Sequence, residues 1–264
     1  MMFLTFSPTP ARPSMVAVLT SLSVALLTLT VAWALIDPRL LGQAPVWAKP
    51  AKFALSFVVL FGTLALIEQR LSPQWRNGWT LQITAGVMAT AMIIEMGYMI
   101  FMAAQQQASH FNYSTAFTTM MYGVMGVGAV SLVVGIAVFG AVALRDAKAD
   151  FGPALRFGVG WGAILSGGMT LVTAGYMSST GTHVGVMVPG AATLPLMGWS
   201  ATIGDIRPAH FLALHGVQVL PLIGLWFDRR GIAVRRMSWV ALAYVVLTAA
   251  VFAQALAGLP LIRL

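Results

Sequence analysis

Residues 115–144 read TAFTTMMYGVMGVGAVSLVVGIAVFGAVAL and contain no charged side chain. About 20 apolar residues in a helix are enough to cross the hydrocarbon core of a bilayer. A helix also satisfies its own backbone hydrogen bonds, which lipid cannot do for it. This stretch therefore predicts a membrane-spanning helix, and its character recurs along most of the chain.

The composition of the 264-residue chain supports the same fold class. Hydrophobic residues make up 59% of it and charged residues only 8%, whereas soluble domains carry about 25% charged residues. The alternation of apolar and polar residues that is typical of membrane barrels is absent. We predict an all-α, polytopic transmembrane helical bundle that forms one domain, residues 1–264. The seven expected spans are 14–36, 52–68, 79–104, 115–144, 154–176, 208–227 and 237–258.

Lysine and arginine fall unevenly between the loops, which predicts an orientation. Cytoplasmic loops are enriched in these residues, and a cytoplasmic N-terminus puts ten of them inside and five outside. The inner set is Arg12, Arg70, Arg76, Arg145, Lys148, Arg156, Arg229, Arg230, Arg235 and Arg236. The outer set is Arg39, Lys49, Lys52, Arg207 and Arg263. We expect a periplasmic C-terminus. The net charge of +8 lies in short loops, so the expected partner is the lipid bilayer and not nucleic acid.

All four histidines fall in the outer half of this topology: His110, His183, His210 and His215. Histidine near a bilayer core is costly and usually has a partner. His210 and His215 are five residues apart on one expected helix, which turns them about 140° from each other. Each should therefore face its own partner, and the two should not share one small ion.

Haem b is the cofactor that this pattern predicts. Haem iron takes axial histidines from separate segments, and four histidines allow one or two haems. Cysteine is absent, which excludes iron–sulfur clusters, thiolate metal sites and the covalent attachment of c-type haem. The alternative for each histidine is a local hydrogen bond to the backbone or to water.

Five further residues are candidates for the same site. Lys49, Lys52 and Arg207 lie on the outer side, against the charge rule, where they could pair with haem propionates, lipid phosphate or Asp37, or simply reach the headgroups. Glu95 lies inside the third span, where a carboxyl group is a functional candidate by default. It could accept a ring N–H from a ligating histidine, carry protons, or stay protonated. Gln218 follows His215 by three residues and could support it.

Two other patterns leave alternatives open. Methionine is frequent near the outer ends of the third and fourth spans, and methionine with histidine suits copper. Gly158 and Gly162 form a GxxxG pair, which lets helices approach closely, either within the chain or in a homodimer.

Three stretches carry a resemblance: WAKPAKFALSF (47–57), ASHFNYSTAF (108–117) and GDIRPAHFLALHGVQVLPLIG (204–224). They resemble an uncharacterised family of bacterial multi-span inner-membrane proteins with SHFN and HFxxLHxxQ motifs. The resemblance runs through most of the chain, implies a multi-pass protein of the bacterial inner membrane, and implies little about activity. The arrangement is also similar in kind to membrane b-type cytochromes, although the regular histidine spacing of quinol-oxidising cytochromes b is absent.

We therefore predict a membrane b-type haem protein with one or two haems near the periplasmic face. It would transfer electrons to a redox partner or react with a small oxidant such as oxygen or superoxide. Whether it is a haem-dependent oxidoreductase stays open. The alternatives are a copper-binding protein that uses histidine and methionine, and a proton-coupled transporter that uses Glu95.

Overall fold

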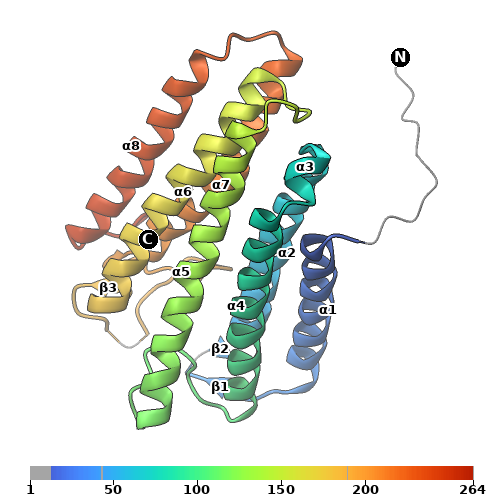
Figure 1. Cartoon of the computed structure of the whole chain (residues 1–264). Helices are drawn as coiled ribbons and strands as arrows, with labels where there is room; N and C mark the ends of the chain where they lie inside the picture. Colours follow the sequence, from blue (N-terminus) through green and yellow to red (C-terminus); the bar gives the residue numbers. More distant parts are fainter. Residues whose placement is uncertain (1–12, 43, 189, 264) are drawn as a thin grey trace.

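Seven long helices run side by side through the molecule, and a short helix separates the second long helix from the third (Figure 1). The computed structural model describes residues 13–42, 44–188 and 190–263. Its helices are α1 (Met15–Ile36), α2 (Ala48–Arg70), α3 (Pro73–Arg76), α4 (Trp79–Ala104), α5 (Ala116–Arg145), α6 (Pro153–Thr180), α7 (Arg207–Arg229) and α8 (Arg236–Leu256). Two antiparallel hairpins pair β1 (Leu40–Leu41) with β2 (Ala44–Pro45), and β3 (His183–Val184) with β4 (Gly204–Asp205).

The predicted bundle is confirmed in its main feature, because the seven long helices are long and apolar enough to cross a membrane. α4 coincides with the predicted span 79–104. α2 begins at Ala48 and not at 52, because the helix continues past the apolar core and carries its lysines on its first turns. The hairpins and α3 were not predicted from the sequence.

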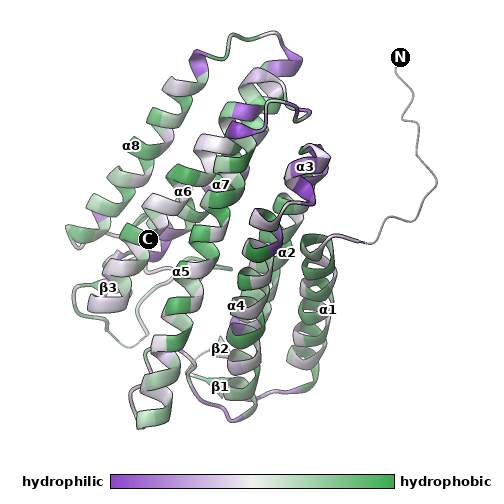
Figure 2. Ribbon diagram, in the orientation of Figure 1, coloured by the Kyte–Doolittle hydropathy of each residue, from purple (hydrophilic) through white to green (hydrophobic). Residues whose placement is uncertain are grey.

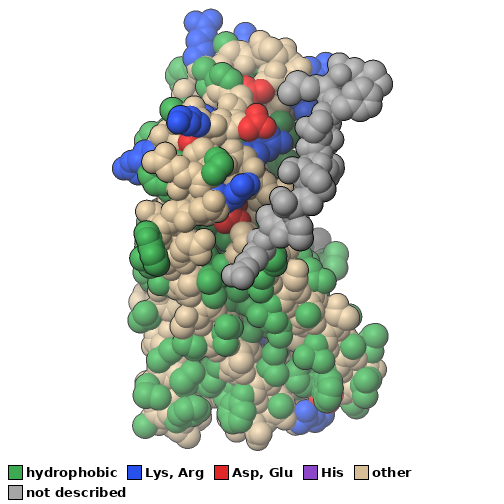
Figure 3. Space-filling model, turned by 45° about the vertical axis from the view of Figure 1, so that its right-hand side comes forward, with side chains coloured by type: hydrophobic (Ala, Val, Ile, Leu, Met, Phe, Trp, Pro, Cys, Tyr) green, Lys and Arg blue, Asp and Glu red, His purple; other side chains and the backbone are tan. Residues whose placement is uncertain are grey.

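The two ends of the bundle differ in charge. One end, which we call the Arg-rich end, contains the connections 71–78, 146–152 and 230–235. The other, the histidine end, contains the connections 37–47, 105–115 and 181–206. Nine of the ten predicted inner cations lie at or near the Arg-rich end, and Arg12 falls outside the described residues. Figure 2 shows hydrophilic segments at the Arg-rich end, and Figure 3 shows most of the visible Lys and Arg side chains there, above an apolar flank.

The helices form two groups that meet along α4 and α5. In the first group α1 packs against α2, and α4 contacts both. In the second group α5, α6, α7 and α8 follow one another, with the most extensive contact between α6 and α7. The main core joins the groups through fully buried side chains such as Phe61 of α2, Met88 of α4 and Phe139 of α5.

Glycines show that α6 packs more closely near the Arg-rich end than near the histidine end. A Cβ atom at Gly158 would collide with the backbone of Leu220 and Pro221 on α7. A Cβ at Gly162 would lie 3.1 Å from the carbonyl oxygen of Gly216. The GxxxG pair therefore brings α6 against α7 within the chain. Toward the histidine end, Gly168 would meet no atom within 4 Å.

The Arg-rich end is closed by hydrogen bonds to helix termini. The carboxylate of Asp228 accepts hydrogen bonds from the backbone N–H groups of Ala154 (3.0 Å) and Leu155 (2.8 Å). These N–H groups belong to the first turn of α6, where backbone N–H groups have no acceptor inside the helix. Asp146 accepts a hydrogen bond from the backbone N–H of Ser72 at 2.7 Å, which ties α5 to the start of α3.

Candidate functional site

All four histidines lie in the half of the molecule next to the histidine end. His110 is in the α4–α5 connection, His183 is on β3, and His210 and His215 are in the first half of α7. The candidate site is therefore built mainly on α7 and on the segments that surround its N-terminal half.

One partly polar stripe on α2 and one on α7 come into contact at a single point. Residues spaced i, i+4, i+7 and i+11 share one helix face. Both stripes have this spacing, and none of their residues is buried. The α7 stripe consists of Phe211, His215, Gln218 and Leu222. The α2 stripe consists of Lys52, Ser56, Val59 and Thr63.

One hydrogen bond joins the two stripes: the Gln218 side-chain amide donates to Thr63 Oγ1 at 3.3 Å. Both helices run from the histidine end toward the Arg-rich end, so residues at equal offsets from this contact lie at similar depths. A rise of 1.5 Å per residue puts His215 about 5 Å from the contact toward the histidine end, and Lys52 about 16 Å from it. Gln218, expected to support His215, contacts α2 instead.

The proton position of His215 follows from its partner. Its Nδ1 atom lies 2.7 Å from the backbone carbonyl oxygen of Phe211, and a carbonyl oxygen can only accept a hydrogen bond. Nδ1 therefore donates, and in the neutral ring Nε2 keeps its lone pair. The His215 and Phe211 rings stack with centroids 3.9 Å apart, which fixes the ring plane. Nε2 makes no hydrogen bond within the described part of the chain.

His210 shows the same protonation pattern through a different partner. Its Nδ1 atom lies 3.0 Å from Oγ1 of Thr173 on α6. Thr173 Oγ1 also lies 3.0 Å from the carbonyl oxygen of Met169, which can take the hydroxyl proton, and in that arrangement Thr173 accepts from His210. Nε2 of the neutral His210 ring is then also the atom with a free lone pair. In metal sites a ligating histidine usually donates its other ring N–H in this way.

His183 belongs to a polar cluster that closes the α6–α7 connection. Its Nδ1 contacts Thr182 Oγ1 at 2.9 Å, and its Nε2 lies 3.2 Å from Arg207 Nη2. The Arg207 side chain in turn donates to the buried carboxylate of Asp205, which also accepts from the backbone N–H of Ser200. Burial would raise the pKa of Asp205, but hydrogen bonds from His183, Arg207 and Ser200 lower it below its ordinary value. Both ring nitrogens of His183 are thus engaged.

His110 lies apart from this cluster, beside the start of α2. Its ring centroid is 5.5 Å from that of Phe53 and 6.1 Å from that of Tyr122, and its Nδ1 contacts Ser109 Oγ at 3.1 Å. Burial, together with the positive charge of Lys49, lowers the pKa of His110 from 6.5 to about 3. The ring is therefore neutral at physiological pH, as a metal ligand must be.

The cations of the histidine end divide into paired and unpaired groups. Arg39 binds Asp37 at 2.7 Å, and Arg207 binds Asp205 through the same Asp-x-Arg spacing. Asp37 was one of the predicted partners of the lysines, but its carboxylate is paired with Arg39. Lys49 and Lys52 are exposed, and no ion pair between described residues involves either of them. Both remain available to an anion.

Glu95 lies in the middle of α4 with only 4% of its surface exposed. Its Oε1 atom has no hydrogen-bond partner among the described residues. The atom faces Gly128 of α5, where an added Cβ would lie 3.1 Å away. Glu95 thus makes no described hydrogen bond to a histidine.

The residues that the structure describes do not form a conventional metal cluster. No group of three or more His, Asp and Glu side chains among residues 13–42, 44–188 and 190–263 is arranged to hold one metal ion. The methionines Met96, Met99 and Met102 are buried in the cores around α4. A haem needs only single axial histidines from different segments, and the copper alternative uses methionine with histidine, so the absence of such a cluster among these residues decides neither prediction.

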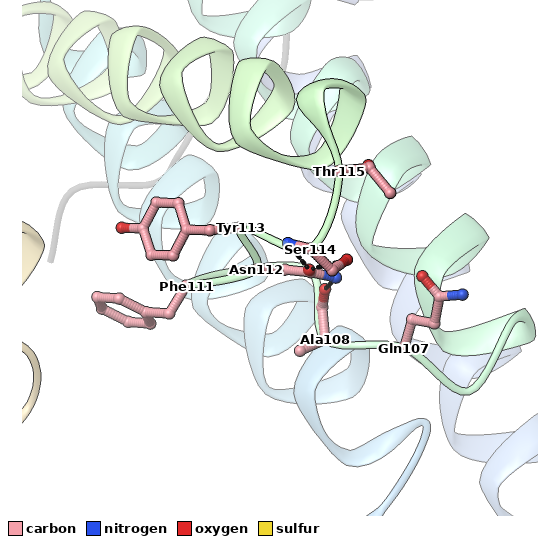
Figure 4. A pocket seen from close by; sticks show the side chains of 7 residues that line it. All are labelled: Gln107, Ala108, Phe111, Asn112, Tyr113, Ser114 and Thr115. Atoms are coloured by element: carbon pink, nitrogen blue, oxygen red, sulfur yellow. Dashed lines mark hydrogen bonds between the residues drawn. The ribbon is translucent and has the colours of Figure 1, made fainter.

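The SHFN motif has a local structural role that the sequence did not reveal. Asn112 donates its side-chain N–H to the carbonyl oxygen of Ala108 at 2.9 Å, and its side-chain oxygen accepts from the backbone N–H and hydroxyl of Ser114. These bonds shape the α4–α5 connection around an open cavity of about 570 Å³ (Figure 4). The motif thereby positions the adjacent His110.

Comparison with protein-family models, with curated proteins and with solved structures finds no match to this chain. The resemblance noted from the sequence motifs stays a prediction.

Proposed function

We propose that this protein is a membrane b-type haem protein of the bacterial inner membrane, in which His215 and His210 are axial ligands. The observation that carries the proposal is the orientation of these two rings. His215 holds its Nδ1–H in a hydrogen bond to the Phe211 carbonyl oxygen and leaves Nε2 with its lone pair, and the contact of His210 Nδ1 with Thr173 is consistent with the same tautomer. Neutral imidazole in this tautomer is the form that binds haem iron.

His210 contacts Thr173 on α6, whereas His215 contacts Phe211 of α7 itself. Five residues of helix turn the two rings about 140° apart, which favours separate iron atoms or one haem with one spare histidine. His110 is proposed as a ligand from a second segment, because it is neutral and lies next to α2. We leave His183 outside the ligand set, because both of its ring nitrogens are engaged.

The unpaired lysines of α2 complete the proposed site. A haem carries two propionate carboxylates, and Lys52 lies on the α2 stripe, which meets the α7 stripe at the Thr63–Gln218 contact. Lys49 lies near His110, whose pKa its charge lowers. Bound haem supplies a reversible one-electron centre, and the residues of this chain would hold it, orient it and keep it in an apolar environment that tunes its potential.

The distribution of charge supports an orientation for the proposed protein. Nine Lys and Arg residues lie at or near the Arg-rich end, so the positive-inside tendency places that end in the cytoplasm. The histidine end then faces the periplasm, and electrons would pass to a partner or a small oxidant on that side.

Absorption spectroscopy of the purified protein tests the proposal. We expect a Soret band and an α band in the reduced-minus-oxidised spectrum. We also expect His215→Ala to lose most or all of the signal from the haem it ligates, while the matched variant His183→Gln keeps the wild-type spectrum. A colourless, iron-free preparation from iron-replete cells would contradict the proposal, and copper without iron in elemental analysis would favour the copper alternative.

A further inference from the structure

Two polar atoms on one face of α4 are buried without a partner. Glu95 Oε1 and the Tyr98 hydroxyl make no hydrogen bond among the described residues, and the two residues are 4% and 6% exposed. Residues three apart lie on the same helix face, and the helical rise places Tyr98 about 4.5 Å nearer the histidine end. Buried polar groups in native proteins are normally hydrogen-bonded. These two atoms are therefore expected to bind a proton or a small polar molecule in place of the hydrogen-bond partner that the described residues do not supply.

The surroundings of Glu95 determine what that ligand is. No described ion pair includes Glu95, and the nearest part of α5 is Gly128, which has no side chain. An ionised carboxylate without a cation is very costly in such a place, because lipid and apolar side chains cannot solvate it. The carboxyl group is therefore expected to hold a proton. Gly128 lets α5 approach this carboxyl group closely, because an added Cβ would lie only 3.1 Å from Glu95 Oε1.

Polar side chains continue from Tyr98 to the histidine end. Tyr98 packs with Met102 and Met125 into a small cluster against which Tyr122 of α5 lies. The Tyr122 ring centroid is in turn 6.1 Å from that of His110 in the α4–α5 connection.

The titratable groups that line this route come from every element around it. They are Glu95 and Tyr98 on α4, Tyr122 on α5, His110 and Tyr113 in the connection, and Lys49 on α2.

We propose that Glu95 is a proton-binding site in the middle of the bundle that exchanges its proton with water at the histidine end along Tyr98 and Tyr122. In one exchange the O–H bond of Glu95 breaks as its proton leaves along this route, and a proton that arrives from water at the histidine end by the same route re-forms the bond. Each tyrosine hydroxyl gives up one proton as it accepts another, so that no group is oxidised or reduced. Glu95 is not one of the proposed haem ligands, although the route ends beside one of them, His110.

Infrared spectroscopy of the protein in liposomes tests the proposal directly. We expect a protonated-carboxyl C=O band at neutral pH that shifts on exchange from H₂O to D₂O. The band should vanish in Glu95→Gln and move in Glu95→Asp. Tyr98→Phe removes one hydroxyl from the route, so we expect deuterium exchange at Glu95 to slow about tenfold, the effect of one lost hydrogen bond in the barrier.

Matched variants distinguish a specific effect on proton exchange along the route from a general effect of mutation. Gly128→Ala places a methyl group 3.1 Å from Glu95 Oε1 and should slow the exchange, whereas Gly126→Ala meets no atom within 4 Å and should not. Tyr176→Phe on α6 should also leave the exchange rate unchanged.

Two results would overturn the proposal. One is a spectrum in which neither Glu95→Gln nor Glu95→Asp alters a protonated-carboxyl band. The other is an exchange rate that neither Tyr98→Phe nor Gly128→Ala changes. Neither measurement depends on haem, so a failure here and a failure of the haem proposal can be told apart.

Discussion

Glycines on α5 and α6 play different roles in the two halves of the bundle. Toward the Arg-rich end, a Cβ at Gly140 of α5 would lie 2.6 Å from Ala163 of α6, and Gly158 touches the backbone of α7. Toward the histidine end, Gly126 and Gly168 have no neighbouring atom within 4 Å. Apart from Gly128, whose added Cβ would lie 3.1 Å from Glu95, the glycines of α5 and α6 therefore bring helices together in one half and have no close neighbour in the other. Function is expected in the less tightly packed half, where all four histidines lie.

The largest loss of stability should come from replacing a glycine in the closely packed half with alanine. Gly158→Ala forces its methyl group into the Leu220 carbonyl, and overpacking of this kind costs about 1–3 kcal/mol. Gly168→Ala on the same helix should be neutral or stabilise the protein by up to about 1 kcal/mol, because alanine is the better helix former. Thermal unfolding in detergent measures both. Equal effects at the two positions would show that the packing difference is not real.

A smaller loss of stability is expected from a change at the Arg-rich end. Asp228→Ala removes the acceptor of two backbone N–H groups at the start of α6, and loss of a helix cap costs about 1–2 kcal/mol. The control is Asp150→Ala, whose carboxylate is 93% exposed and lies 3.9 Å from Arg70. A surface pair of this kind contributes at most about 1 kcal/mol. A stability loss in Asp150→Ala as large as that in Asp228→Ala would contradict the role of Asp228 as a cap.

The effect that is smallest at neutral pH concerns the titration of His110 at the histidine end. Its pKa in the folded protein is lowered to about 3 from 6.5, so between these values the unfolded chain binds more protons than the folded one. Stability should therefore fall as the pH is lowered from 6.5 toward 3, and His110→Phe should weaken this dependence. Lys49→Gln should raise the pKa of His110 in an NMR titration, because it removes a nearby positive charge. A His110 that titrates near 6.5 would show that the ring is solvated.

The sequence predicted the spans well because hydrophobicity and length determine them. It placed α4 correctly at 79–104, where polar residues flank the apolar run. It began α2 too late, because Lys49 and Lys52 resemble the end of a span although both lie within the helix. Hydropathy locates the membrane boundary, whereas the helix extends beyond it.

The sequence predicted which residues belong to the candidate site, but not which partners they contact. The Asp-x-Arg spacing of Asp205 and Arg207, repeated in Asp37 and Arg39, could have indicated that both arginines are paired. The partner of His210 could not be predicted, because Thr173 is 37 residues away and contacts it only through the packing of α6 on α7.

The connections between the two helix groups have a mechanical consequence. Among the described residues, hydrogen bonds between helices α1–α4 and the segment from α5 to α8 occur at Arg70 and Ser72, at the Arg-rich end, and otherwise only between Thr63 and Gln218. Away from the Arg-rich end, the covalent α4–α5 connection, the apolar core and this single hydrogen bond hold the two groups together. Loss of the Thr63–Gln218 bond would leave α2 and α7 with no described hydrogen bond between them, so that only apolar packing would resist their sliding past each other.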